Sequence, residues 1–141
     1  MIIKKLKNTK VKKVTIGGGN GSIMLLDLID IKNNKFILYI YSTWRLHQKG
    51  KIVTSNDDFT LQDNEGVVQL KSLENKEITG VSCSQLGDVR LVFDSKIELD
   101  VFCDLTYSEE GLYENWSVCD LSNNLCENWT DSFDISKEAY E

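Results

Sequence analysis

The sequence lacks the features on which several classes of function depend. No apolar run approaches the roughly 18 residues that a membrane-spanning helix needs. The lysine-rich start is not followed by an apolar stretch of signal-peptide length or by a cleavage site of small residues. There is one histidine, and no two of the four cysteines have the Cys-x-x-Cys spacing of a zinc knuckle or redox pair. We therefore expect a soluble, cytoplasmic protein without a metal ion or cofactor.

Catalytic motifs are also missing. The glycine-rich segment 17–21 lies between two expected strands and is followed by no helix and no Gly-Lys-Ser/Thr, so it predicts a tight turn and not a phosphate cradle. His47 falls in an expected exposed turn, and nothing marks it as a catalytic base. Adjacent acids such as Asp57 and Asp58 point apart in an extended chain, which favours solvated charge over a catalytic pair. We predict that the chain is not an enzyme.

The cysteines divide into two pairs. Cys83 and Cys103 fall in expected strands, where a cysteine usually acts as a small buried hydrophobe. Cys119 and Cys126 could form a disulfide in an oxidising compartment, but nothing else in the sequence points to such a compartment.

Charge is distributed unevenly along the chain, whose net charge is −6. Six lysines and no acid lie within the first 13 residues, whereas ten acids and the single Lys137 lie between Asp104 and the end. Phosphate binding draws its affinity from lysine and arginine, so the acidic third is a poor nucleic-acid surface. It favours a basic protein as partner.

Strand patterns dominate the first 104 residues. The expected strands, which are rich in β-branched and aromatic residues, are 11–16, 23–28, 36–41, 77–84, 89–93 and 96–103. The segments 21–27 (GSIMLLD) and 87–94 (GDVRLVFD) share a glycine, a β-branched residue and an apolar run that ends in aspartate. We interpret residues 11–45 and 76–107 as two copies of one three-strand antiparallel meander.

The expected fold is mainly β, in a single domain spanning residues 1–141. In the last expected strand Ile97, Leu99 and Val101 form one apolar face and alternate with Glu98 and Asp100, which should be wet. Two meanders that each hide one apolar face would pack as a small sandwich or a half-open barrel. Residues 43–75 should connect them and include a short helix over 67–73, and residues 104–141 should form an irregular acidic, aromatic segment.

The tripeptide Glu-Asn-Trp occurs twice in the acidic third, at 114–116 and 127–129. Each tryptophan could anchor an irregular segment onto the sheet. Alternatively, exposed aromatic side chains among acids could form a binding surface, because Trp and Tyr are favoured interface anchors and charge of one sign steers an oppositely charged partner.

Three stretches of the chain resemble a known family. The strand YSTWRL with the following IVTSNDD, the second copy KEITGVSCSQLGDVRLVFDSKIELDVFCD, and YENWSV are similar to small bacterial immunity proteins of polymorphic or contact-dependent toxins, including the wall-associated-protein type. The resemblance covers roughly residues 35–120 and departs from the family at the lysine-rich start and the second Glu-Asn-Trp. It implies a protein that binds one cognate toxin domain, often a nuclease, and blocks it by occlusion.

The leading hypothesis is therefore an immunity protein for a basic toxin domain. The residues expected to bind the partner are Asp104, Glu109, Glu110, Tyr113, Glu114, Trp116, Asp120, Trp129, Asp131 and Asp134. The alternative is a non-catalytic ligand- or protein-binding β module, which a deep apolar pocket lined by Phe36, Leu38, Val101 and Phe102 would favour. A hydrolase would instead require two acids converging in a cleft.

Overall fold

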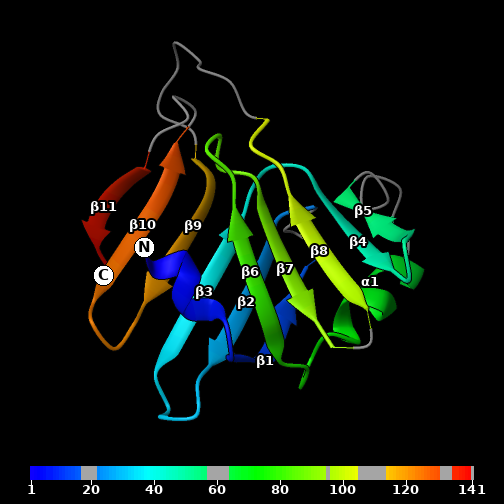
Figure 1. Ribbon diagram of the computed structural model, residues 1–141, viewed down its shortest axis with the longest axis horizontal. Helices are drawn as coiled ribbons and strands as arrows, with labels where there is room; N and C mark the ends of the chain where they lie inside the picture. Colours follow the sequence, from blue (N-terminus) through cyan, green and yellow to red (C-terminus); the bar gives the residue numbers. More distant parts are fainter. Residues whose placement is uncertain (17–21, 57–63, 95, 105–113, 131–134, 141) are drawn as a thin grey trace.

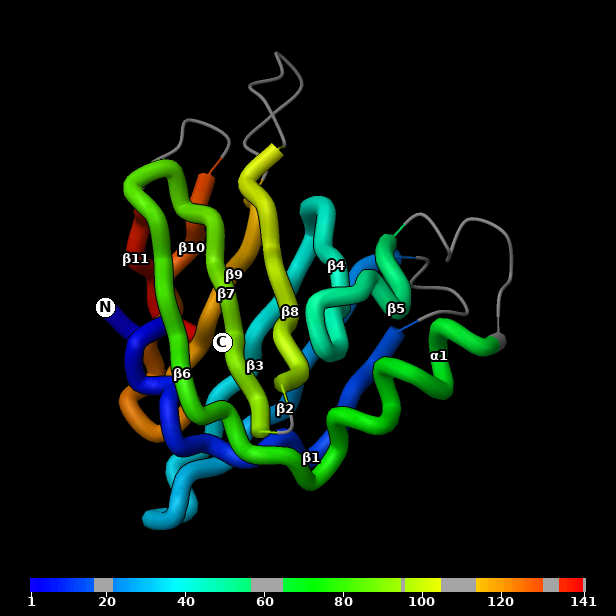
Figure 2. The backbone as a smooth tube through the Cα atoms, turned by 45° about the vertical axis from the view of Figure 1, so that its right-hand side comes forward, coloured from blue at the N-terminus to red at the C-terminus, as the bar shows by residue number. Residues whose placement is uncertain are grey.

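Two antiparallel sheets pack face to face in the computed structural model of the chain (Figure 1). The model describes residues 1–16, 22–56, 64–94, 96–104, 114–130 and 135–140. Seen from the side, the sheets form two layers, and the helical segments lie at their margins (Figure 2). No helix in these ranges is long and apolar enough to span a membrane.

Eleven strands and two helical segments make up the described ranges. The first sheet has the order β1 (Lys10–Thr15), β2 (Met24–Ile29), β3 (Lys35–Ile40), β9 (Glu114–Asp120), β10 (Leu125–Thr130) and β11 (Ile135–Ala139). The second sheet has the order β5 (Lys51–Ser55), β4 (Trp44–Gln48), β8 (Ile97–Val101), β7 (Val89–Phe93) and β6 (Ile78–Cys83). The helical segments are the 3-10 helix η1 (Ile2–Leu6) and the α-helix α1 (Asn64–Lys71).

The mainly-β prediction is confirmed, and the sheets are open and not closed into a barrel. The two expected meanders lie one in each sheet, β1-β2-β3 in the first and β6-β7-β8 in the second. Both sheets contribute to one hydrophobic cluster, so the interior is filled by side chains such as Leu26, Leu38, Leu91 and Leu99. The expected short helix is α1, which buries Leu70 and is followed by the buried Leu73.

Two sequence-based expectations are corrected. The connecting region contains the hairpin β4–β5, so His47 lies in a strand and not in an exposed turn. The acidic third is not irregular where it is described, because β9, β10 and β11 are regular strands of the first sheet. The alternation of apolar and polar residues that marks a half-exposed strand is missing there. Residues 115–120 of β9 are buried on both faces of the sheet, and the outer face carries small side chains in place of exposed charged ones.

The turns are built without proline and largely with asparagine. Six described non-glycine residues have positive φ, and four of them are Asn8, Asn33, Asn75 and Asn124. Asparagine tolerates the left-handed conformation better than most residues because its short amide bonds locally to the backbone. The asparagine content of the chain therefore has a structural use at these reversals.

The lysine-rich start is held against the acidic third. In η1 the side chains of Ile2, Ile3 and Leu6 are buried, and the helix packs on β6, β9 and β10. The backbone N–H of Ile2 donates to Glu127 Oε1 at 2.9 Å, a buried contact. The start of the chain is thus fixed to the acidic third by apolar packing and by this buried hydrogen bond.

Gly87 joins the two sheets at the β6–β7 turn. It has φ +88°, and a Cβ placed there would lie 2.1 Å from the Trp129 ring. Its carbonyl accepts a hydrogen bond from Trp116 Nε1 at 2.8 Å. Trp116 and Trp129 themselves stack with ring centroids 5.9 Å apart.

We expect Gly87→Ala to lower the free energy of unfolding by about 3 kcal/mol, since it adds a left-handed alanine and overpacks Trp129. Gly50→Ala is the matched control, because Gly50 has φ +79° but nothing within 4 Å of its added Cβ. The control should lose only about 1 kcal/mol. Urea unfolding of both variants measures the difference, and equal losses would contradict the packing role of Gly87.

Candidate binding groove on the first sheet

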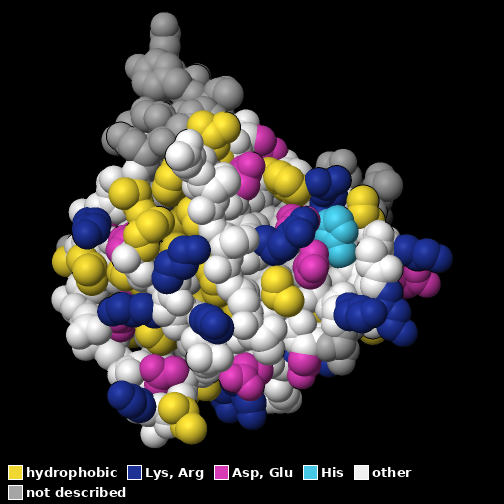
Figure 3. Space-filling model, viewed as in Figure 1, with side chains coloured by type: hydrophobic (Ala, Val, Ile, Leu, Met, Phe, Trp, Pro, Cys, Tyr) yellow, Lys and Arg dark blue, Asp and Glu magenta, His cyan; other side chains and the backbone are white. Residues whose placement is uncertain are grey.

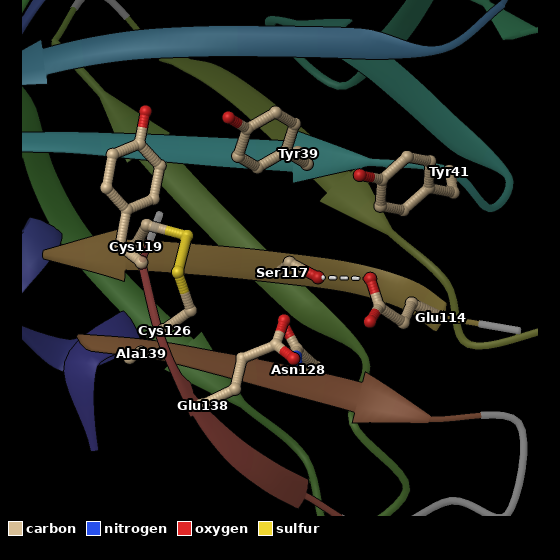
Figure 4. Close-up of a pocket in the computed structure, with 10 residues that line it drawn as sticks. Tyr39, Tyr41, Glu114, Ser117, Cys119, Cys126, Asn128, Glu138 and Ala139 are labelled. Carbon is tan, nitrogen blue, oxygen red and sulfur yellow. Dashed lines mark hydrogen bonds between the residues drawn. A yellow bond between two sulfur atoms is a disulfide. The ribbon is translucent and has the colours of Figure 1, made fainter. Parts of the chain in front are cut away.

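The outer face of the first sheet carries a groove of about 440 Å³ between β3 and β11 (Figure 4). Its floor is made by Ser117, Cys119, Cys126 and Asn128, which point away from the core yet are 3–4% exposed. Larger side chains stand on both sides of this floor. The wall residues are Tyr39, Tyr41, Glu114, Glu138, Ala139 and Tyr140.

The strand register explains why these residues meet. Tyr39 pairs with Ser117 across β3 and β9, and Ser117 pairs with Asn128 across β9 and β10. Side chains paired in this way share one face of a sheet. The aromatic wall, the polar floor and the acidic wall therefore follow from one continuous ladder through β3, β9, β10 and β11.

The walls of the groove are aromatic and negatively charged. Tyr39 and Tyr41 stack with ring centroids 6.2 Å apart and ring planes within 4° of parallel. Glu114 accepts a hydrogen bond from Ser117 Oγ at 2.8 Å, and Glu138 is exposed. No lysine or arginine is among the described residues that line the groove.

The environment of the groove raises the pKa of both tyrosines. Burial raises the pKa of Tyr41 above 10.0, and the negative charges of Glu114 and Glu138 raise it further. Burial also raises the pKa of Tyr39, with Tyr140 and Asp27 as additional causes. Both tyrosines are therefore neutral at physiological pH, and the groove has a negative potential that favours cations.

The floor contains one side-chain acceptor without a partner. Asn128 is 3% exposed, and its Oδ1 has no hydrogen-bond partner among the described residues. A buried polar atom in a folded protein almost always has one. Asn128 is therefore the member of the floor whose hydrogen bonding is incomplete.

A disulfide between Cys119 and Cys126 cross-links β9 and β10 in the same floor. These residues are directly paired in the sheet, with Cα atoms 4.0 Å apart. The other two cysteines, Cys83 and Cys103, are free. Burial raises the pKa of Cys103 to about 12, with Asp88 as a further cause, so this thiol is protonated and poorly nucleophilic near neutral pH.

The outer face of the second sheet differs from the groove in that its described acids Glu98 and Asp100 are paired with Arg90. Arg90 binds Asp100 through Nε at 2.6 Å and Nη2 at 3.1 Å, and His47 Nε2 lies 3.0 Å from the same carboxylate. The expectation that Asp100 is wet is wrong, since it is 6% exposed beside the Arg90 and His47 side chains. Lysine, arginine and acidic side chains alternate around the single histidine on this face (Figure 3).

This second face gives no support to a hydrolase. Glu98 and Asp100 converge on Arg90, which lies 3.4 Å from Glu98, so both acids are engaged by a cation. Within the described ranges, no three His, Cys, Asp or Glu side chains gather as a metal site requires.

The structure separates the predicted partner-binding residues. Trp116 and Trp129 are 0% and 7% exposed inside the sandwich, so they are core residues and not surface anchors. Asp120 is also buried. Its carboxylate accepts hydrogen bonds from Lys5 of η1 and from Asn123 in the β9–β10 turn. The pKa of Asp120 is lowered by these bonds, although burial alone would raise it.

Two of the remaining predicted residues are described. Asp104 is exposed and accepts hydrogen bonds from the backbone and hydroxyl of Thr43. Glu114 lies in the groove wall. The other five lie outside the described residues: Glu109, Glu110, Tyr113, Asp131 and Asp134.

Sequence reasoning missed Tyr39, Tyr41, Asn128 and Glu138. A signal for the tyrosines exists in the segment FILYIY, because Phe36, Leu38 and Ile40 take the buried face and place both tyrosines on the other. Asn128 had no such signal, since its role depends on the pairing of β9 with β10.

No family, no curated protein and no solved structure matches this chain.

The cysteine pairing is tested by alkylation in denaturant without a reductant. We expect two alkyl groups per chain by intact mass, on Cys83 and Cys103, because the other two sulfurs are joined. All four should react after reduction. Four adducts without reduction, in protein purified under oxidising conditions, would contradict the disulfide.

The groove potential is tested by an NMR pH titration of the Tyr41 ring. We expect a pKa above 10.0 in the unmodified chain and a lower one in Glu114→Gln, because that change removes a negative charge that stabilises the neutral phenol. Glu77→Gln, at an exposed acid before β6, is the control and should leave the Tyr41 pKa unchanged. An unchanged Tyr41 pKa in Glu114→Gln would refute the coupling.

Proposed function

We propose that this chain is an immunity protein, which binds a basic toxin domain and blocks it by occlusion without catalysing a reaction. The observation that carries the proposal is the groove on the first sheet, which is lined by tyrosines and acids and by no described cation. Tyrosine offers large rigid contact area, and negative potential accelerates association with a positive partner. A nuclease toxin must present such a positive surface to bind phosphate.

The acidic third supports this assignment through its position in the fold. Its described strands β9, β10 and β11 form most of the groove, so the part of the chain with the largest excess of acids is also the part that builds the concave surface. The sequence resemblance in the segments 41–46, 52–58, 76–104 and 113–118 supports the choice of the immunity class within this proposal.

The alternative, a non-catalytic β module for another ligand or protein, is weaker for an apolar ligand. Phe36, Leu38 and Val101 belong to the packed core, and the Phe102 ring lies on the outer face of the second sheet beneath the Arg45 guanidinium at 4.5 Å. These four residues therefore do not line one shared interior pocket, although Val101 and Phe102 border a hollow of about 400 Å³ on the outer face of the second sheet.

The compartment in which the protein acts is part of the proposal. The sequence favoured the cytoplasm, where thiols are kept reduced, whereas the Cys119–Cys126 disulfide is typical of an oxidising compartment. We propose cytoplasmic action in the toxin-producing cell. On this proposal the pair is reduced in the cell, and β9 and β10 remain held by their backbone ladder.

Charge reversal tests the electrostatic part of the proposal. On this proposal the neighbouring upstream gene encodes the toxin. In the double variant Glu114→Lys, Glu138→Lys, we expect association with that gene product to slow about tenfold or more at low salt, because steering by charge contributes at least that factor. Stopped-flow association measured at several salt concentrations gives the rate and its salt dependence.

The matched control is Glu77→Lys, Asp94→Lys, which changes net charge equally at two exposed acids outside the groove. It should retain most of the association rate. Equal slowing of both double variants would show that only net charge matters. Failure of the chain to co-purify with the upstream gene product would remove the immunity assignment itself.

A further inference from the structure

The hydrogen-bonding state of Asn128 indicates what the groove receives. Its Oδ1 is a buried acceptor with no partner among the described residues, at the floor of an open groove. Its neighbour across β9, Ser117, has a single hydroxyl hydrogen and donates it to Glu114. The missing donor therefore has to come from outside this pair.

The charge around Asn128 favours a cationic donor. Glu114, at the start of β9, and Glu138, on β11, both line the groove, and no described lysine or arginine does. A carboxylate or phosphate ligand would meet like charge from both acids. A cationic donor would satisfy the amide oxygen and neutralise the walls in one step.

The aromatic wall favours a planar cation. Tyr39 and Tyr41 present nearly parallel rings, and a guanidinium stacks on such a ring while its five N–H groups remain free to donate in its own plane. The same chain uses both contacts on its other sheet, where Arg45 lies over Phe102 and Arg90 binds Asp100 through two nitrogens. An ammonium group offers only three donors and no plane to stack.

We propose that the groove binds the guanidinium group of an arginine side chain on the partner, with Asn128 Oδ1 as the central acceptor. Glu114 and Glu138 supply the opposing charge, and Tyr41 supplies the stacking face. This inference deepens the proposed function and rests on it only in requiring a partner that presents arginine.

A titration of the isotope-labelled full chain with capped Gly-Arg-Gly peptide tests the site without the toxin. We expect the side-chain amide of Asn128 and the ring of Tyr41 to shift. The same peptide with citrulline, which keeps the shape and loses the charge, should give no shift, and the lysine peptide should bind at least threefold more weakly. Equal shifts with citrulline, or equal affinity for lysine, would overturn the proposal.

Asn128→Leu then isolates the acceptor. We expect arginine affinity to fall at least fivefold while the thermal unfolding midpoint stays level or rises, because an apolar side chain replaces an unsatisfied amide. Gln69→Leu makes the same chemical change on the exposed side of α1 and should bind arginine normally. Unchanged arginine binding in a folded Asn128→Leu protein would overturn the proposal.

The two proposals fail in distinguishable ways. If arginine binding depends on Asn128 but the chain does not inhibit the upstream toxin, the arginine site is supported and the immunity function is refuted. If Asn128→Leu neutralises the toxin fully, the immunity function is supported and the role of the arginine site in it is refuted.

Discussion

Strand β9 is the constraint on which the rest of the structure depends. It lies between β3 and β10 in the first sheet, and its residues 115–120 are buried on both faces. Inward, Trp116 and Val118 complete the core against the second sheet. Outward, Ser117 and Cys119 are too small to fill the space between the flanking side chains. A buried strand with small outward residues between tall neighbours makes a groove, so one strand produces both the sandwich and its concave surface.

The β6–β7 turn of the second sheet contacts the first sheet directly. The carbonyl of Gly87 receives the indole N–H of Trp116, and the glycine lies so close to Trp129 that no other residue fits without displacement. Trp116 and Trp129 pair directly across β9 and β10. The groove floor is therefore fixed from behind, since the strands that carry Ser117 and Asn128 outward are the strands that carry these indoles inward. A rigid floor favours binding because less conformational freedom is lost when a partner is engaged.

Strands could be predicted from the sequence where one face is buried and the other exposed, because only such strands show apolar–polar alternation. Ile97, Leu99 and Val101 alternate with polar residues, and their buried face was predicted correctly. The strand β9 carries no such alternation, because both of its faces are buried, and the acidic third was wrongly expected to be irregular. The tryptophans were considered as surface anchors because their neighbours are charged. Glu127 is itself buried, however, and accepts the N–H of Ile2. Such long-range partners leave no local pattern, and neither does the incomplete hydrogen bonding of Asn128.

The acids of the C-terminal third differ in their positions in the fold. Lys5 pairs with Asp120 and offsets one acid of the acidic third, and the backbone N–H of Ile2 donates to Glu127. The two acids engaged there face the interior, whereas Glu114 and Glu138 remain at the groove. Beneath them the buried Asn128 Oδ1 has no partner among the described residues. The guanidinium proposed for the partner would complete its hydrogen bonding.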